Sequence, residues 1–164
     1  MDTFFIFGAV YAIAIPVIVL LIWLSKAKKE ERIRLICFAL ISLPITYLIG
    51  YIAGKIYPNP RPFISDGIIP LIAHSASNGF PSDHTLLAGA IAALLWPFSR
   101  RTSLWLWLVA IYIGLSRVYV GVHHTADIVG ALIIATAVAW AVWKSGWVEK
   151  LVHKWHRWHG SHAA

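Results

Sequence analysis

The sequence has little charge and almost no cysteine. Only 13% of its 164 residues are charged, whereas 59% are hydrophobic, and the mean hydropathy is +0.72. This composition leaves too few polar residues for the surface of an ordinary soluble domain, so it predicts a protein that lies in a lipid bilayer. The one cysteine, Cys37, stands in an apolar run, which excludes a secreted scaffold held together by disulfide bonds.

Acidic residues are also scarce. The chain has 7 Asp and Glu residues against 14 Lys and Arg, which gives a formal net charge of +7. In a soluble protein this excess would suggest nucleic acid as a partner. Here the basic residues flank apolar stretches, so membrane topology and anionic lipid headgroups explain them better, and we expect no nucleic-acid partner. Because the chain has no cluster of free carboxylates to hold a divalent cation, we expect neither a metal nor another cofactor.

Five apolar stretches divide the chain. A helix needs about 20 residues to cross a bilayer, and all but the third stretch are long enough. The third must extend into its flanks or begin below the membrane surface. We therefore expect one all-α membrane domain over residues 1–164, a bundle of about five to six transmembrane helices. The stretches are Phe4–Leu24, Ile33–Gly54, Thr85–Phe98, Leu104–Val122 and Ala126–Trp143.

Basic residues gather on one side of this five-span arrangement. Cytoplasmic loops of membrane proteins are enriched in Lys and Arg, so the side that holds 11 of the 14 basic residues is expected to be cytoplasmic. Lys55, Arg61 and Arg117 are left on the opposite side, where topology does not explain them. The cytoplasmic set is Lys26, Lys28, Lys29, Arg32, Arg34, Arg100, Arg101, Lys144, Lys150, Lys154 and Arg157.

Three polar segments would meet on the side opposite this basic set. The guanidinium group of arginine and the ammonium group of lysine both bind phosphate, so Lys55, Arg61 and Arg117 predict a phosphate site there. The segments are Lys55–Pro62, Pro81–His84 and Ser116–Asp127.

The start of the third apolar stretch suits the same anion. Ser82 is a good N-cap residue, so it predicts a helix that begins there. The first backbone N–H groups of that helix, from Asp83 and His84, would point outward and could bind a phosphate oxygen.

A histidine and a carboxylate lie close together in the third polar segment. His123 and Asp127 stand four residues apart, so their side chains can share one face if that stretch is helical. A carboxylate bonded to one imidazole nitrogen makes the other nitrogen a better nucleophile. Asp127 could merely cap this helix, but Thr125 could do the capping instead, which would leave Asp127 free to bond His123. We expect His74 and His124 to be bystanders.

These segments resemble the signature of the type 2 phosphatidic acid phosphatase superfamily. The third segment has the family pattern without a gap: Ser116-Arg117, five residues, His123, three residues and Asp127. The second motif has Asp83 where the family usually has Gly, and the first has five residues between Lys55 and Arg61 instead of six. Pro-Ser-Asp-His, preceded by His-Ser-Ala-Ser-Asn-Gly-Phe, is similar to the bacitracin-resistance type of undecaprenyl pyrophosphate phosphatase. The resemblance covers roughly residues 50–131.

The resemblance implies a phosphatase of the bacterial cell membrane that works through a phosphohistidine. It implies His123 as the nucleophile, Asp127 as its partner and His84 as the general acid, without a metal. With the basic side in the cytoplasm, this active site would face the extracytoplasmic side. The implied phosphate ligands are Lys55, Arg61, Ser82, Asp83 and Arg117.

Undecaprenyl diphosphate is the expected substrate, because Asp83 marks the variant second motif. Phosphatidylglycerophosphate, phosphatidic acid and a lipid A phosphate stay open as alternatives, as does the oligomeric state. A lipid carrier without enzymatic activity would explain the three cations on this side, but neither His84 nor the spacing of His123 and Asp127. The tail over residues 145–164, with His153, His156, His159 and His162, is expected to form an interfacial amphipathic anchor.

Overall fold

The computed structural model describes the backbone of residues 1–160 and the side chains of residues 1–158, and every regular element in this part of the chain is a helix. The predicted all-α architecture is confirmed. The helices are α1 (Asp2–Val10), α2 (Ala14–Lys26), α3 (Lys29–Ile56), α4 (Pro62–Ser65), α5 (Asp83–Leu95), α6 (Arg100–Tyr119), α7 (Thr125–Lys144) and α8 (Trp147–Gly160).

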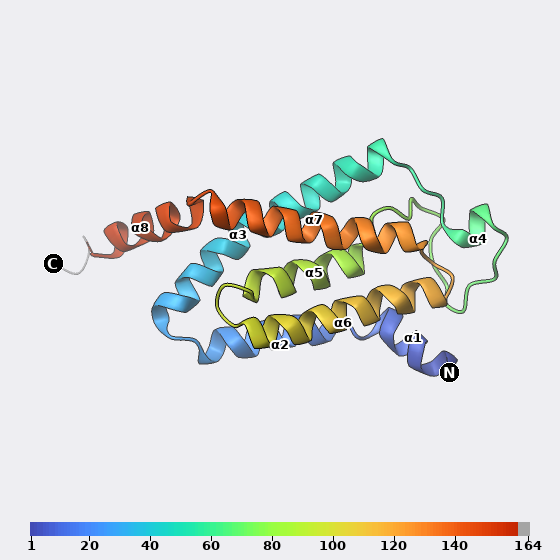
Figure 1. Ribbon diagram of the computed structural model, residues 1–164, viewed down its shortest axis with the longest axis horizontal. Helices are drawn as coiled ribbons and strands as arrows, with labels where there is room; N and C mark the ends of the chain where they lie inside the picture. Colours follow the sequence, from blue (N-terminus) through green and yellow to red (C-terminus); the bar gives the residue numbers. More distant parts are fainter. Residues whose placement is uncertain (161–164) are drawn as a thin grey trace.

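The long helices run back and forth, so their connections collect at two ends of the bundle (Figure 1). One end holds the N-terminus, the short helix α4 and the segments 57–82 and 120–124. The other end holds the turns at 27–28 and 96–99, with α8 beyond them (Figure 1). The three polar segments therefore lie at one end of the bundle, as the five-stretch pattern predicts.

Among the described residues, three helices are long and apolar enough to cross a bilayer: α3, α6 and α7. Helices α1 and α2 pass the same test only as a pair bent by 51°, so Phe4–Leu24 forms two helices instead of the continuous span we expected. Pro16 accounts for the interruption, because it has no N–H to donate to the carbonyl of Ala12 and its ring crowds that carbonyl. Helix α5 has only 13 residues and is shorter than a span.

Helix α5 lies among the other helices and positions part of the polar end. It packs against α2, α3, α6 and α7, and its residues from Thr85 onward are almost all buried. Alanine and glycine dominate its middle, and such small residues allow neighbouring helices to approach closely. Because α5 is enclosed along its length, packing fixes the place of its first turn, where Asp83 and His84 lie.

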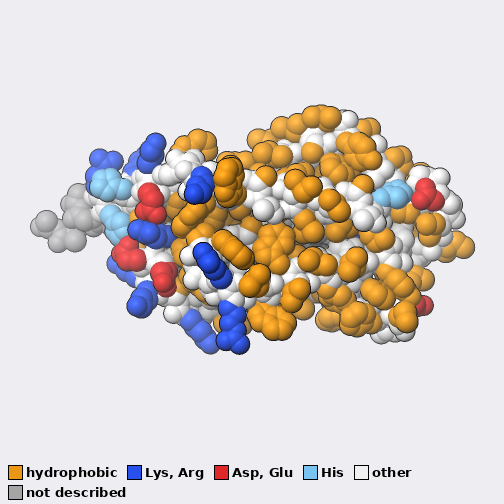
Figure 2. Space-filling model, viewed as in Figure 1, with side chains coloured by type: hydrophobic (Ala, Val, Ile, Leu, Met, Phe, Trp, Pro, Cys, Tyr) orange, Lys and Arg blue, Asp and Glu red, His pale blue; other side chains and the backbone are white. Residues whose placement is uncertain are grey.

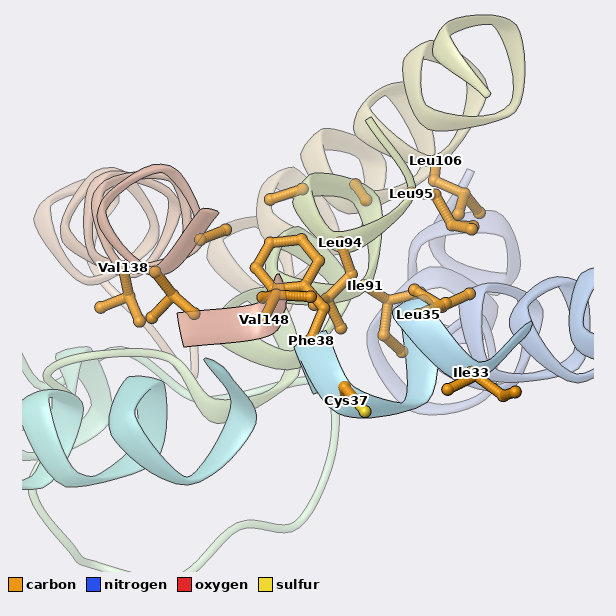
Figure 3. Close-up of a cluster of buried hydrophobic side chains, with 14 of the residues drawn as sticks. Ile33, Leu35, Cys37, Phe38, Ile91, Leu94, Leu95, Leu106, Val138 and Val148 are labelled. Carbon is orange, nitrogen blue, oxygen red and sulfur yellow. The ribbon is translucent and has the colours of Figure 1, made fainter. Parts of the chain in front are cut away.

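The end of the bundle away from the polar segments is closed by a large apolar cluster. Figure 3 shows Phe38 of α3, Leu94 of α5, Val138 of α7 and Val148 of α8 together in it. Phe38, Leu94 and Val148 each expose 1% of their surface or less. The cluster therefore fastens α8 to the bundle.

Lys and Arg side chains gather at the end that carries α8 (Figure 2). One of them, Arg34, pairs with Glu149 of α8 at 3.3 Å. The collection of basic residues at one end agrees with the sequence. Binding of the tail to a membrane surface stays a prediction, since His162 lies outside the described residues and so does the side chain of His159.

Candidate active site

The polar end buries a group of charged and polar side chains drawn from all three polar segments. Arg61 comes from the loop after α3, Ser82 from the residue before α5, and Arg117, His123 and Asp127 from the end of α6 to the first turn of α7. Each exposes 4% of its surface or less. Burial of two arginines beside a histidine and a carboxylate is costly unless each charge has a partner, so the arrangement has to be explained by its contacts.

Asp127 holds His123 through one nitrogen of the imidazole ring. Nδ1 of His123 lies 3.1 Å from Oδ2 of Asp127. The same oxygen accepts the backbone N–H of His124 at 2.9 Å, and His124, not Thr125, is the N-cap residue of α7. The suggestion that Thr125 caps the helix is wrong: Asp127 satisfies the backbone of the cap residue and still bonds His123, because a carboxylate oxygen has two lone pairs.

The opposite nitrogen of His123 faces the arginines. With Nδ1–H donating to Asp127, Nε2 carries a lone pair and accepts from Arg61 Nη1 at 3.0 Å and from Arg117 Nη2 at 3.4 Å. Burial lowers the pKa of His123, and the two arginines lower it further, while the bond to Asp127 acts in the other direction. The ring is therefore neutral at neutral pH, and the lone pair of Nε2 faces the two arginines.

Backbone carbonyls hold both arginines in place. Arg61 Nη1 donates to the carbonyl of Val122 at 2.8 Å, and Arg117 Nη1 donates to the carbonyl of Ala9 in α1 at 3.1 Å. The Nε–H group of each arginine is buried without a partner among the described residues. A buried donor without an acceptor is rare in native proteins. Two such donors beside one imidazole are suited to the oxygens of a phosphate.

The first turn of α5 borders the same place. Ser82 is the N-cap residue, as predicted, but its hydroxyl accepts from Thr85 at 3.2 Å and does not cap the backbone. Its N–H donates to the carbonyl of Asp127 at 3.2 Å, which ties α5 to α7. Asp83 is exposed and His84 half-buried. Their backbone N–H groups are the first of the helix, where an anion is favoured.

Lys55 does not join this group. It lies near the end of α3 on the exposed surface, with Nζ 5.3 Å from the centre of the Tyr51 ring. It lines a groove of about 460 Å³ together with Tyr51, Phe80 and Asp83. Of the eight site residues predicted from the sequence, five form the buried group, and Asp83 and His84 border it in the first turn of α5. Lys55 lies outside it, in the side groove that Asp83 also lines.

Asn59, which was not predicted as a site residue, holds the carboxylate of Asp127 in place. Its Nδ2 donates to Oδ1 of Asp127 at 2.7 Å, on the oxygen that His123 does not use. Asn59 is itself fixed, because its N–H donates to Oδ1 of Asn78 at 2.7 Å and its carbonyl accepts from Gly79 at 2.8 Å. The signal that could have identified Asn59 is its place between two prolines, since a proline restricts the backbone conformation of the residue before it.

Replacing Asn59 with alanine is expected to lower kcat about 10- to 100-fold with little change in KM. The reason is that a hydrogen bond to a charged group contributes about 1.5–3 kcal/mol, and here it orients the carboxylate that orients His123. Steady-state kinetics of Asn59→Ala in detergent measures this. Asn59→Asp should be at least as impaired, because it puts a second carboxylate against Asp127. Unchanged kcat in both variants would exclude a positioning role.

The two histidines that were expected to be bystanders have contacts at or near the buried group. His74 lies with Nε2 2.8 Å from Nη2 of Arg117, so it reaches the buried group from the long loop. His124 lies with Nε2 3.3 Å from Asp66 and Nδ1 3.3 Å from the amide of Asn59. Isolated histidines in a loop carry no pattern that predicts these contacts.

Known proteins are similar in sequence to this chain over most of its length. Residues 32–150 match the model of the PAP2 superfamily. The chain is 35% identical over 124 residues to the bacitracin transport permease protein BcrC of Bacillus licheniformis, covering 74% of this chain and 60% of that protein. It is 33% identical over 139 residues to the undecaprenyl-diphosphatase BcrC of Bacillus subtilis strain 168, covering 84% of this chain and 71% of that protein.

The fold has a counterpart among solved structures. The crystal structure of Aquifex aeolicus LpxE matches with a TM-score of 0.70 and 26% sequence identity, over 87% of this chain and 85% of that chain. The chain spans about three fifths of the length of the Bacillus licheniformis protein. The matched region, residues 32–150, contains all three polar segments and the buried group that they form, and the chain belongs to the PAP2 superfamily.

Proposed function

We propose that this protein is a membrane enzyme that hydrolyses undecaprenyl diphosphate to undecaprenyl phosphate and inorganic phosphate. The observation that carries the proposal is the set of contacts around His123, whose Nε2 faces Arg61 and Arg117 while Nδ1 is bonded to Asp127. This arrangement suits attack on a phosphorus atom. The choice of lipid is supported by the similarity to a protein named undecaprenyl-diphosphatase.

The first half of the reaction is a displacement at the terminal phosphorus. Nε2 of His123 forms a bond to that atom while the bond to the bridging oxygen breaks, and lipid monophosphate leaves. Arg61 and Arg117 stabilise the charge on the phosphoryl oxygens, and Asp127 stabilises the imidazolium that forms.

His84 acts on the leaving group and then on water. Burial and the charge of Arg117 lower the pKa of His84 to about 4, so the ring takes up its proton together with the anionic substrate. It donates this proton to the departing oxygen, and in the second half it takes a proton from the water that attacks the phosphohistidine. Inorganic phosphate is released and His123 returns to its neutral form. Ser82 and the backbone N–H group of Asp83 contribute further donors to the phosphate. Lys55, in the side groove, attracts the anionic headgroup as the lipid approaches the site.

Two other functions can be separated from this one by a phosphate-release assay. Purified protein in detergent is supplied with undecaprenyl diphosphate, phosphatidylglycerophosphate, phosphatidic acid and a lipid A phosphate side by side. The proposal expects the highest kcat/KM with undecaprenyl diphosphate. A higher value with another lipid would change the substrate but keep the mechanism. Headgroup binding without phosphate release from any lipid would instead favour a carrier.

The active site is expected to face the extracytoplasmic side, because the basic residues gather at the other end of the bundle. A membrane-impermeant thiol reagent applied to intact cells should label Ser65→Cys, which is exposed at the end of α4, and should not label Ala27→Cys at the opposite end. The native Cys37 is buried and contributes little background. The reverse labelling pattern would place the site in the cytoplasm.

Activity is expected to survive EDTA. The phosphate would be held by two arginines, and Asp127 is already committed to His123, Asn59 and the backbone of His124. Vanadate should inhibit, because its trigonal-bipyramidal adduct resembles the phosphoryl group in transfer. Phosphate release is measured with and without chelator. Activity that disappears in EDTA and returns with Mg²⁺ would contradict the roles given to the arginines.

A further inference from the structure

His74 is held close to the phosphate site by two anchors in its own loop. The N–H of Leu71 donates to the carbonyl of Val120 at 3.0 Å, and Ile72 packs into a small apolar cluster with Val120 and Val122. Both anchors lie within three residues of His74 and join its loop to the turn that carries His123. The position of His74 is therefore set by the same turn as the position of the nucleophile.

Arg117 lies between the two histidines. Its Nη2 is 2.8 Å from Nε2 of His74 and 3.4 Å from Nε2 of His123, while the two rings have centroids 6.3 Å apart and no direct hydrogen bond. A phosphoryl group that bonds Arg117 and faces His123 would thus have His74 as its neighbour on another side. In an in-line displacement the leaving oxygen lies opposite the nucleophile. His74 bonds the same Arg117 nitrogen as His123, so a chain of two phosphates that extends from the attacked phosphorus past Arg117 would come within reach of the His74 ring.

We propose that His74 contacts the second phosphate of a lipid diphosphate, the phosphate that leaves with the lipid, and so makes the enzyme favour diphosphates over monophosphates. The proposal rests on the proposed phosphatase activity and deepens it. His74 is the only described histidine, apart from the implied catalytic pair, that lies within hydrogen-bonding distance of an arginine of the site. A lipid monophosphate has no second phosphate that could contact His74.

The neutral ring can make this contact without a net change in protons. Nδ1 of His74 lies 3.3 Å from the carbonyl of Ser75, so in this structure Nδ1 carries the proton and Nε2 accepts from Arg117. When phosphate oxygens take up the Arg117 donor, the ring loses that donor. The proton then moves to Nε2, which donates to the second phosphate at the cost of the long bond to Ser75. Burial and the charge of Arg61 lower the pKa of His74, which agrees with a neutral ring.

Two other roles for His74 predict different results. If it merely occupies Arg117, its removal should improve binding of every phosphate substrate. If it merely supports the loop, its removal should impair all substrates equally. Only a contact with the second phosphate changes the ratio between a diphosphate and a monophosphate of the same alcohol.

The test compares the full-length wild type with His74→Ala, His74→Gln and the control His153→Ala, a histidine exposed on α8. The substrates are an isoprenyl diphosphate and the monophosphate of the same alcohol, in detergent. We expect His74→Ala to lower the ratio of the two kcat/KM values about tenfold or more, because it removes a hydrogen bond to a charged group. His74→Gln, which keeps an N–H donor, should recover part of the ratio, and His153→Ala should leave it unchanged.

Inhibition by inorganic pyrophosphate and by phosphate supplies a second readout. It is measured on an activated aryl phosphate and does not depend on which lipid is the natural substrate. His74→Ala should weaken inhibition by pyrophosphate and affect inhibition by phosphate much less. An unchanged ratio of the two inhibition constants, or an equal change in both, would overturn the role of His74. If the wild type instead prefers the monophosphate, the proposed substrate is wrong, and the inhibition constants still decide on His74.

Discussion

The variant His123→Ala is expected to lose turnover on every substrate, by a factor of at least about 10⁴. The loss should not depend on the leaving group, because Nε2 of His123 forms the bond to phosphorus and no other described side chain has a carboxylate on one ring nitrogen and two arginines at the other. Phosphate release is measured with a lipid diphosphate, a lipid monophosphate and an activated aryl phosphate.

A folded variant is needed for this result to be informative. Removal of the ring leaves Asp127 with its bonds to Asn59 and to the backbone of His124, so its charge keeps partners. To establish folding, His123→Ala should elute from a size-exclusion column in detergent as a single species, at the same volume as the control His153→Ala. Residual activity within tenfold of the wild type on any of the three substrates would show that His123 is not the nucleophile.

The second large effect is expected at His84, and it should depend on the leaving group. General acid catalysis contributes about 10²–10⁴-fold when the departing oxygen needs a proton. His84→Ala should therefore lose most of its activity with a lipid monophosphate, whose alkoxide leaves badly. It should be mildly impaired with an activated aryl phosphate, and a lipid diphosphate should fall between them. The position of His84 in the first turn of α5, next to the anion site, is the reason for the assignment.

The pattern across the three substrates separates His84 from His123. Plotting log(kcat/KM) against the pKa of the leaving group should give a steeper line for His84→Ala than for the wild type. An equal loss with all three leaving groups would remove the acid role. If His84→Ala alone failed to form a phosphoenzyme, the roles of the two histidines would have to be exchanged.

The parts of the site that could be predicted from the sequence are those set by local geometry. His123 precedes α7, which begins at Thr125, so the two side chains do not share a helix face as predicted; the spacing of four residues still brings Nδ1 of His123 within 3.1 Å of Oδ2 of Asp127 in the first turn. Arg117 lies in the last turn of α6, six positions before His123, and a tight turn at Gly121, with φ +77°, connects the two. Gly121 adopts this left-handed conformation without the strain of a side chain.

The parts that could not be predicted depend on contacts between distant segments. Asn59 and His74 lie in one long loop, and their roles arise only when it meets Asp127 and Arg117. Lys55 was expected beside Arg61, but α3 continues to Ile56, so the direction of the Lys55 side chain follows the helix and not the loop.

A hydropathy profile also does not detect a break in a helix. The stretch around Pro16 is apolar on both sides of the bend, so its composition is that of one continuous span. The loss of the proline N–H interrupts the helix without any change in hydropathy. This interruption matters for the site, because the carbonyl of Ala9 in α1 accepts from Arg117 at 3.1 Å.

Trapping of the phosphoenzyme tests directly whether His123 is the nucleophile. Protein is mixed with a lipid diphosphate labelled in its terminal phosphate, quenched in alkali within one turnover, digested and mapped. We expect label that is stable to alkali and labile to acid, as a phosphohistidine is, on the peptide that contains His123. We also expect none in His123→Ala. Rapid release of labelled phosphate with no label on the protein, or label on another residue, would contradict this role of His123.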